Sequence, residues 1–192
     1  MKDIVLSVCA MLFLSLFLTD LSKASDQPGI PPSTVADYIH AVIEANRTFY
    51  TIHVVERLQK SGVSVAAENW RAKKNVLPLP AQFLMESSEL GAETGSKVRY
   101  RLLSLWPINP QNSPHSESEK KGLEAVIQQP ERSATATVKI GNQTYFQAIY
   151  ADHAVTQACI GCHNVHPRSP KKDFKLKDVM GGLVIEIPLN QE

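Results

Sequence analysis

The chain has 192 residues, with 20 Lys and Arg against 19 Asp and Glu, so its formal net charge is +1 at pH 7. This length, with 43% hydrophobic residues, is sufficient for one domain with a substantial core. The near balance of charge lacks the basic excess that is typical of nucleic acid binding, so no nucleic acid partner is expected.

Residues 1–24 are predicted to be a secretory signal peptide. Lys2 supplies the positive start, Ile4 to Leu18 form an apolar run, and Ser22-Lys23-Ala24 provide small residues for cleavage near Ala24. The run is shorter than the ~20 residues that span a membrane. Cleavage and a periplasmic location are therefore expected, with no stable membrane anchor. An uncleaved anchor is the alternative.

A flexible leader is predicted at residues 25–33, followed by one domain at residues 34–192. The domain begins with a long helix that Ser33 or Thr34 can cap and that runs to about Lys60, where Gly62 ends it.

One side of this helix is predicted to face the core, because apolar residues recur on it with helical spacing. That side carries Val35, Ile39, Val42, Asn46, Phe49 and His53. His40 points to the opposite side and is expected at the surface.

The rest of the chain alternates short helices and strands. Helices are predicted at residues 81–90 and 119–128, and strands at 97–105, 134–140, 143–151 and 182–188, of which the middle two form a hairpin around Gly141-Asn142. This pattern predicts an α+β fold, in which an antiparallel sheet is covered by the long N-terminal helix.

The motif most informative about function is Cys159-Ile160-Gly161-Cys162-His163. C-x-x-C-H is the attachment signature of c-type haem. Cys159 and Cys162 would form thioethers to one haem, and His163 would be the proximal axial ligand of its iron. The only other cysteine, Cys9, lies in the predicted signal peptide. We therefore expect one covalently attached haem c in the loop before the last strand.

Two other interpretations of the motif remain open at this stage. A C-x-x-C dithiol of the thioredoxin type is one, although no β-α-β pattern precedes it. The other is a zinc site formed by Cys159, Cys162, His163 and His166, although zinc ligands usually come from two separated pairs.

The group on the other side of the iron would decide the chemistry, because a second strong ligand favours electron transfer and an open position admits small ligands. His53 is the first candidate for the distal iron ligand, because it lies on the predicted core face of the long helix. Met85 is the second, and Met180 is a weaker choice.

Two further groups of residues are candidates for the surroundings of the haem. The basic residues after the motif are either a solvated loop or a surface for the haem propionates or an acidic partner; they are Arg168, Lys171, Lys172, Lys175 and Lys177. The aromatic residues that would line the pocket, or simply the core, are Trp106, Tyr145, Phe146 and Tyr150.

Three segments together resemble a known family: Val76 to Ala81 (V-L-P-L-P-A), Leu103 to Pro110, and Cys159 to Gly181 with its H-N-x-H-P-x-S-P-K extension. The chain is similar, over roughly residues 46–188, to the PAS-like, single-haem c-type periplasmic sensor domains. These occur alone in bacteria, including cyanobacteria, and fused to histidine kinases, nucleotide cyclases and chemotaxis receptors. The resemblance implies a PAS-like fold with a five-stranded antiparallel sheet.

The chain departs from the pattern of this family at two positions. A tryptophan usually takes the place of Phe174, and a glycine that of Lys177. Neither change affects haem attachment.

The resemblance favours an exported haem c protein that senses redox state or a small gaseous ligand. No output domain is expected within this length, so a signal would pass to a separate protein. The alternative is a periplasmic electron-transfer cytochrome c that docks with a redox partner protein. A haem peroxidase ranks last, because no distal His/Arg pair is recognisable, and the protein is not expected to be an enzyme. The sequence does not indicate the oligomeric state.

Overall fold

A computed structural model describes residues 29–189. The predicted signal peptide, Cys9 and most of the predicted leader lie outside these residues. From residue 32 on, the described chain forms one compact unit. Within the described range, no helix has both the length and the apolar character to span a bilayer.

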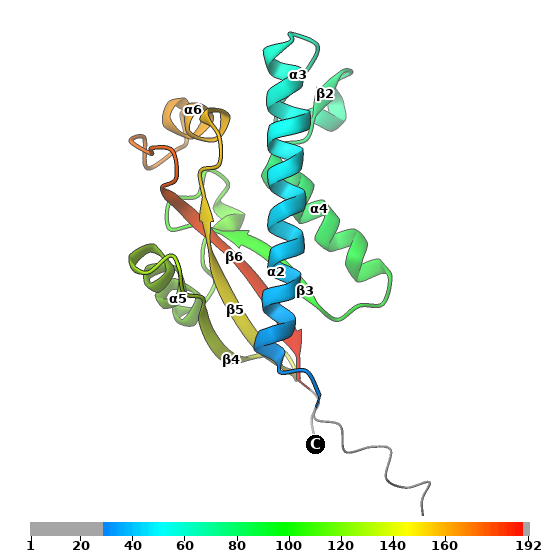
Figure 1. Cartoon of the computed structure of the whole chain (residues 1–192), viewed down its shortest axis with the longest axis vertical. Coiled ribbons are helices and arrows are strands. Elements are labelled where there is room, and N and C mark those ends of the chain that lie inside the picture. Colours follow the sequence, from blue (N-terminus) through cyan, green and yellow to red (C-terminus); the bar gives the residue numbers. More distant parts are fainter. Residues whose placement is uncertain (1–28, 190–192) are drawn as a thin grey trace, which may run out of the picture. The chain divides into compact units, whose positions relative to one another are not determined.

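An antiparallel sheet is the centre of this unit (Figure 1). Its strands are β3 (Arg99–Leu103), β4 (Ala134–Ile140), β5 (Gln143–His153) and β6 (Val179–Pro188), in the order β3-β6-β5-β4. Residues 29–189 thus supply four strands to this sheet rather than the five that the resemblance implied. A separate parallel pair is formed by β1 (Val65–Ala66) and β2 (Val76–Leu77).

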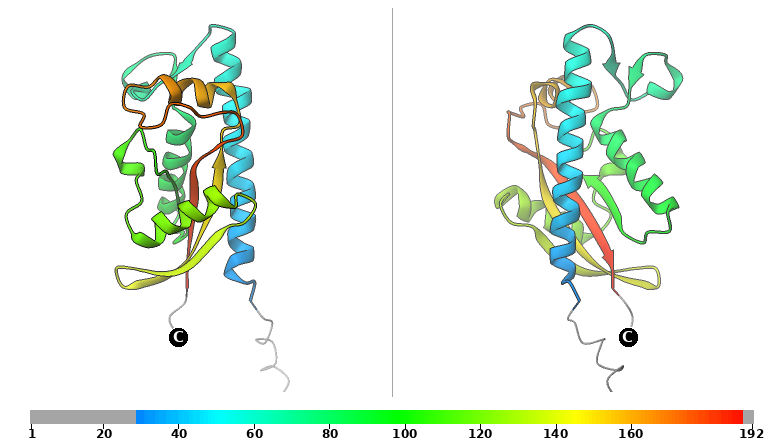
Figure 2. Two further views of the ribbon diagram at one scale, coloured as in Figure 1. Left: turned by 90° about the vertical axis from the view of Figure 1, so that its left-hand side faces the viewer. Right: turned by 45° about the vertical axis from the view of Figure 1, so that its right-hand side comes forward.

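Helices cover both faces of the sheet, which gives a mixed α+β architecture (Figure 2). Side chains alternate along the strands, so Leu102 and Ile185 point toward α2 (Pro32–Phe49) and α4 (Pro80–Glu93). Leu103 and Val184 point the other way, toward α5 (Glu117–Gln128). The predicted packing of the long helix on an antiparallel sheet is confirmed.

The long helix extends as far as the sequence predicts, but its middle has a different geometry. The helix α2 continues as a π-helix, η1 (Tyr50–Glu56), and then as α3 (Arg57–Lys60), before Gly62 turns the chain with a φ of 70°. The hydroxyl of the buried Thr51 donates to the carbonyl of Arg47 at 2.7 Å, where the π segment begins. Such π segments are rare in proteins, and those that do occur often lie at functional sites.

The expected core face of this helix is confirmed at Ile39, which packs against the core cluster, but it is wrong further along the helix. Val42 and Phe49 are each 62% exposed, and Asn46 and His53 are exposed as well. The side that faces the sheet instead carries the fully buried Ala36, which allows close approach, together with polar groups that find partners on β5.

His40 is one of these polar groups, so its expected place at the surface is also wrong. Its ring stacks on that of Tyr150, with the centroids 4.0 Å apart, and its Nε2 lies 3.3 Å from Glu44. Burial lowers the pKa of His40, although Glu44 and Asp37 oppose this. The Tyr150 hydroxyl donates to Asp37 at 2.7 Å. A helical wheel that counts only apolar residues could not find a face held by such pairs.

The proline-rich turn before α4 connects this helix to the end of the long one. Tyr50 donates its hydroxyl to the carbonyl of Pro78 at 2.8 Å and stacks on Phe83 with centroids 4.4 Å apart. Two short 3-10 helices, η2 (Trp70–Ala72) and η3 (Pro110–Asn112), lie in the connections.

A buried polar network lies between the sheet and α5. The Arg101 guanidinium pairs with Glu119 and donates to Glu186 at 3.1 Å, and Gln147 donates to the same Glu186 oxygen at 3.0 Å. Glu119 also accepts from the backbone N–H of His115 at 2.6 Å. Glu186 is 1% exposed and Glu119 is 4% exposed, so Arg101 is the cation that pairs with both buried carboxylates.

Candidate functional site

The C-x-x-C-H motif lies on a helix, α6 (Gln157–Val165), between β5 and β6. The expected loop before the last strand is therefore, at the motif, a helical turn. Residues three apart share one side of a helix, so Cys159 and Cys162 are neighbours there, and His163 follows directly. The helix ends before Pro167, since the residue before a proline avoids helical geometry.

The two cysteines are free thiols in different surroundings. Cys159 is partly buried, with its Sγ 3.6 Å from the hydroxyl of Thr156, and Cys162 is exposed. The partial burial of its thiol, followed by the charges of Glu68 and Cys159, raises the pKa of Cys162. Val165, one turn after Cys162, is 76% exposed, so the helix presents an uncovered apolar surface beside its thiols.

The imidazole of His163 is partly buried against Phe174, which it meets edge to face with centroids 6.0 Å apart. Its Nδ1 is buried and has no hydrogen-bond partner within the described residues. Burial, followed by the nearby His166, lowers the pKa of His163, which favours the neutral imidazole that ligates iron. Two free thiols on one helix side beside a neutral imidazole fit a covalently attached haem.

Asn164, which sequence analysis did not single out, holds this arrangement in place. Its side-chain amide donates to the Phe174 carbonyl at 2.9 Å and accepts from the Phe174 N–H at 3.0 Å. The ring of Phe174 is thereby fixed between His163 and Trp106, whose centroid lies 5.8 Å away in an edge contact. The Nζ of Lys171 lies 5.0 Å from the Phe174 ring centroid. The asparagine beside His163 in the H-N-x-H-P extension was the available signal.

An apolar cluster lies beneath the motif helix. It consists of the buried Ala154, Phe174 and Met180, with Trp106, Cys159 and Ile160 packed against them. Of the four candidate aromatics, Trp106 is the one that packs in this cluster. Lys177, where the family usually has glycine, adopts a φ of 73°. Glycine is favoured in this left-handed region, which explains the family pattern.

The loop after the motif is attached to the β1–η2 connection. The Nη2 of Arg168 donates to both carboxylate oxygens of Glu68, at 2.8 and 2.7 Å. His166 accepts from the Arg168 N–H at 3.2 Å, and its Nε2 lies 3.7 Å from Glu68. His166 therefore caps the loop. Of the predicted basic run, Arg168 and Lys171 have partners, while Lys172, Lys175 and Lys177 are exposed.

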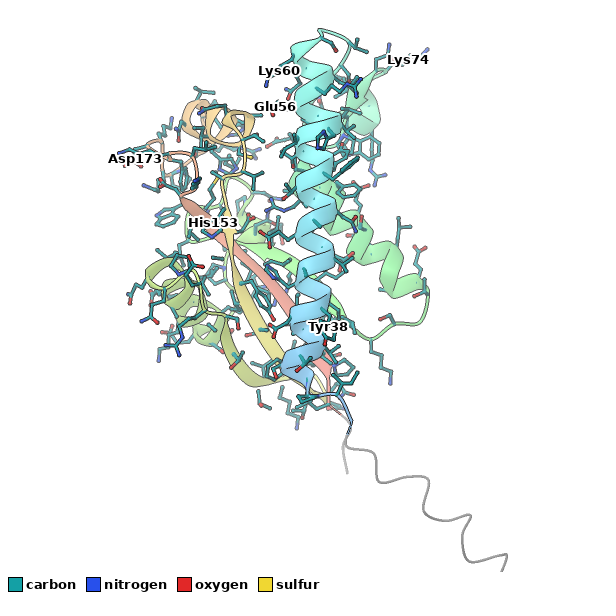
Figure 3. All side chains as sticks on the ribbon, in the orientation of Figure 1. Tyr38, Glu56, Lys60, Lys74, His153 and Asp173 are labelled. Atoms are coloured by element: carbon teal, nitrogen blue, oxygen red, sulfur yellow. The ribbon has the colours of Figure 1, made fainter. Side chains whose placement is uncertain are left out.

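An ion pair between α2 and β5 lies beside the motif. The guanidinium of Arg47 pairs with the carboxylate of Asp152, and their side chains are 13% and 14% exposed. Burial lowers the pKa of Arg47, while Cys159 and Glu44 oppose this. Asp152 lies opposite Gly181, which adjoins Met180 of the cluster against which Cys159 packs. Next to Asp152 in the chain is His153, labelled at the end of β5 in Figure 3; its Nδ1 lies 2.9 Å from the carbonyl of Lys177.

The distal ligand candidates lie in three different environments. His53 is exposed and packs on Phe49, with centroids 4.8 Å apart, so the buried position on which its selection depended is wrong. Met85 packs into the core cluster between the sheet and α2, with Leu84 and Leu102. Met180 belongs to the cluster under α6. Iron ligation by His53 or Met85 stays a prediction.

The zinc interpretation finds no support in the structure. Among residues 29–189, no three or more His, Cys, Asp or Glu side chains converge in a way that could hold a metal ion. The loop-capping role of His166 is consistent with this, because its ring is engaged with Arg168 and Glu68.

Comparisons with known proteins agree with the fold. The model of the family described as Tll0287-like matches residues 23–188. A crystal structure of the cyanobacterial heme-protein Tll0287 aligns with a TM-score of 0.50 and 16% sequence identity, covering 85% of this chain and 99% of that one. At this identity the likeness concerns the fold. No curated protein matches the sequence.

Proposed function

The chain belongs to the Tll0287-like family, whose model covers most of its length, and we propose that it is an exported, non-enzymatic haem c sensor. This membership confirms the resemblance to the single-haem, PAS-like sensor domains. The proposed cofactor is one haem, bound through Cys159 and Cys162, with His163 as the proximal ligand of the iron. A bound haem supplies one-electron exchange and an axial position at which a small ligand can bind.

The arrangement on α6 is the observation that supports this proposal most directly. Cys159 and Cys162 are free and lie on one side of a helix, which suits attachment to a single planar ring. The imidazole of His163 is partly buried, and its Nδ1 has no hydrogen-bond partner within the described residues. The solved relative is titled a heme-protein. Since haem c is attached outside the cytoplasm, the predicted signal peptide and a periplasmic location agree with it.

A role in electron transfer is the second candidate, and one observation favours it. Lys172, Lys175 and Lys177 are exposed on the loop that follows the motif, where they could attract an acidic redox partner. The two roles differ at the iron. A sensor of small ligands should bind carbon monoxide in the ferrous state, whereas a six-coordinate carrier should not.

Covalent haem attachment is the first prediction. When the full chain is produced together with a cytochrome c maturation system, the denatured protein is expected to keep its haem, seen as an added haem mass and a haemochrome absorption. Replacing both Cys159 and Cys162 with serine should abolish covalent attachment, because the motif then has no thiol to form a thioether. Wild-type protein that carries no covalent haem under these conditions would sink the proposal.

The distal position is tested by His53→Ala in the haem-loaded protein. Because His53 is exposed and packs on Phe49, the substitution is expected to leave the ferric and ferrous absorption spectra unchanged. Phe49→Ala is the matched control on the same exposed surface. A change to a high-spin spectrum with His53→Ala alone would instead establish His53 as the distal ligand.

A further inference from the structure

The ion pair of Arg47 and Asp152 joins α2 to β5. Asp152 lies opposite Gly181, next to Met180 of the apolar cluster against which Cys159 packs. Arg47 belongs to the last turns of α2, and Asp152 lies near the end of β5, five residues before the motif helix begins. Both side chains are nearly buried, at 13% and 14% exposure. Buried charges are screened little by salt, so their fields act on neighbouring groups.

Both residues lie next to irregular stretches of backbone. The carbonyl of Arg47 accepts the Thr51 hydroxyl where the α-helix becomes the π segment. Asp152 is paired with Gly181, and the register of β5 and β6 shifts between Asp152 and His153. π segments and β-bulges are both frequent next to functional sites. The pair thus connects two such features beside the proposed haem.

We propose that Arg47 and Asp152 act on the reduction potential of the haem with opposite signs, so that their effects balance while the pair is intact. This inference rests on the proposed function, since it takes haem attachment at Cys159 and Cys162 as its premise. Reduction adds one electron from an outside donor to ferric iron and gives ferrous iron, so the positive charge on the metal falls by one. A buried cation favours the less positive ferrous state, and a buried anion favours the ferric state.

Opposite signs therefore distinguish this role from a merely structural one. Arg47→Gln should shift the equilibrium about tenfold toward ferric haem at a given applied potential, which is 59 mV for one electron. Asp152→Asn should shift it in the opposite direction by a similar factor. The double variant should return to within about threefold of wild type, because the two field changes offset each other.

The experiment is a spectroelectrochemical titration of the haem-loaded full chain with soluble redox mediators. Haem content is measured first in each variant. Arg47→Lys keeps the cation and should stay within about threefold of wild type. If Arg47→Gln fails to fold, Asp152→Asn still tests the predicted sign of the shift by itself. Lys139→Gln is the matched control, because it removes one cation from an exposed position on β4 and should leave the potential unchanged.

Three results would overturn the inference. They are shifts of the same sign for Arg47→Gln and Asp152→Asn, no shift in either haem-loaded variant, and a shift with Lys139→Gln as large as that with Arg47→Gln. A wild-type protein without covalent haem would instead overturn the proposed function, and with it the premise of this inference.

Discussion

Replacing Arg101 with methionine is expected to reduce the free energy of unfolding by about 3–5 kcal/mol at pH 7, because it leaves buried carboxylates without their cation. In the folded protein, Glu119 and Glu186 are 4% and 1% exposed, and both pair with Arg101. Methionine fills a similar volume but offers no charge. Urea unfolding of the variant and of the wild type, followed by circular dichroism, measures the difference.

The loss should depend on pH in a direction that follows from Glu119. Burial raises the pKa of this carboxyl. Hydrogen bonds from Arg101 and from the His115 N–H lower the pKa by more than burial raises it, so the pKa is below its usual value. A lowered folded pKa contributes stability above about pH 4.3, and this contribution is lost as the pH falls. The deficit of Arg101→Met should therefore shrink toward pH 4.

Arg99→Met provides the matched control on the same strand. The Arg99 side chain is 50% exposed and lies 3.8 Å from Glu186, so its removal should cost about 0–1 kcal/mol. Equal losses for the two variants would show that long-range charge balance, and not the buried pairing of Arg101, stabilises this region.

The sequence predicted most of the fold because the strands and the helix ends depend on local signals. The hairpin around Gly141 was located at its observed strands, since Gly141 adopts a φ of 60° that few other residues tolerate. Gly62 ended the long helix where expected. The face of that helix was missed for a different reason. Its packing on the sheet depends on His40 and Arg47, whose partners on β5 lie over a hundred residues away in the chain.

The same distinction applies to the candidate site. Cys159, Cys162 and His163 could be selected because one five-residue motif contains all the groups that the proposed haem attachment requires. Arg47 and Glu68 could not be selected, since each contributes to the site only through a contact with a distant segment: Asp152 for the first, and Arg168 for the second. Spacing patterns show how a residue can act together with its neighbours in the sequence. The members of these two pairs are not neighbours in the sequence, so no spacing pattern contains them.

The second large effect is expected at Gly181, where β6 meets β3 beside the apolar cluster under α6. A Cβ at this position would lie 2.3 Å from the carbonyl oxygen of Leu103 and 3.3 Å from the Cβ of Ser104. Because the first of these atoms is backbone, the strands must separate. Gly181→Ala should cost about 3 kcal/mol in unfolding free energy.

This substitution should also disturb the proposed haem site more than its distance along the chain suggests. The Ser104 hydroxyl donates to the carbonyl of Met180 at 2.6 Å, and Met180 packs in the cluster that supports Cys159. Displacement of β6 would therefore lower haem loading during maturation as well as stability.

Gly91→Ala is the control. Within α4, its added Cβ would meet no atom within 4 Å. Alanine should therefore stabilise the helix by roughly 0.5–1 kcal/mol and leave haem loading unchanged. If Gly181→Ala unfolds at the same urea concentration as wild type, the contact between β3 and β6 is looser than the structure describes.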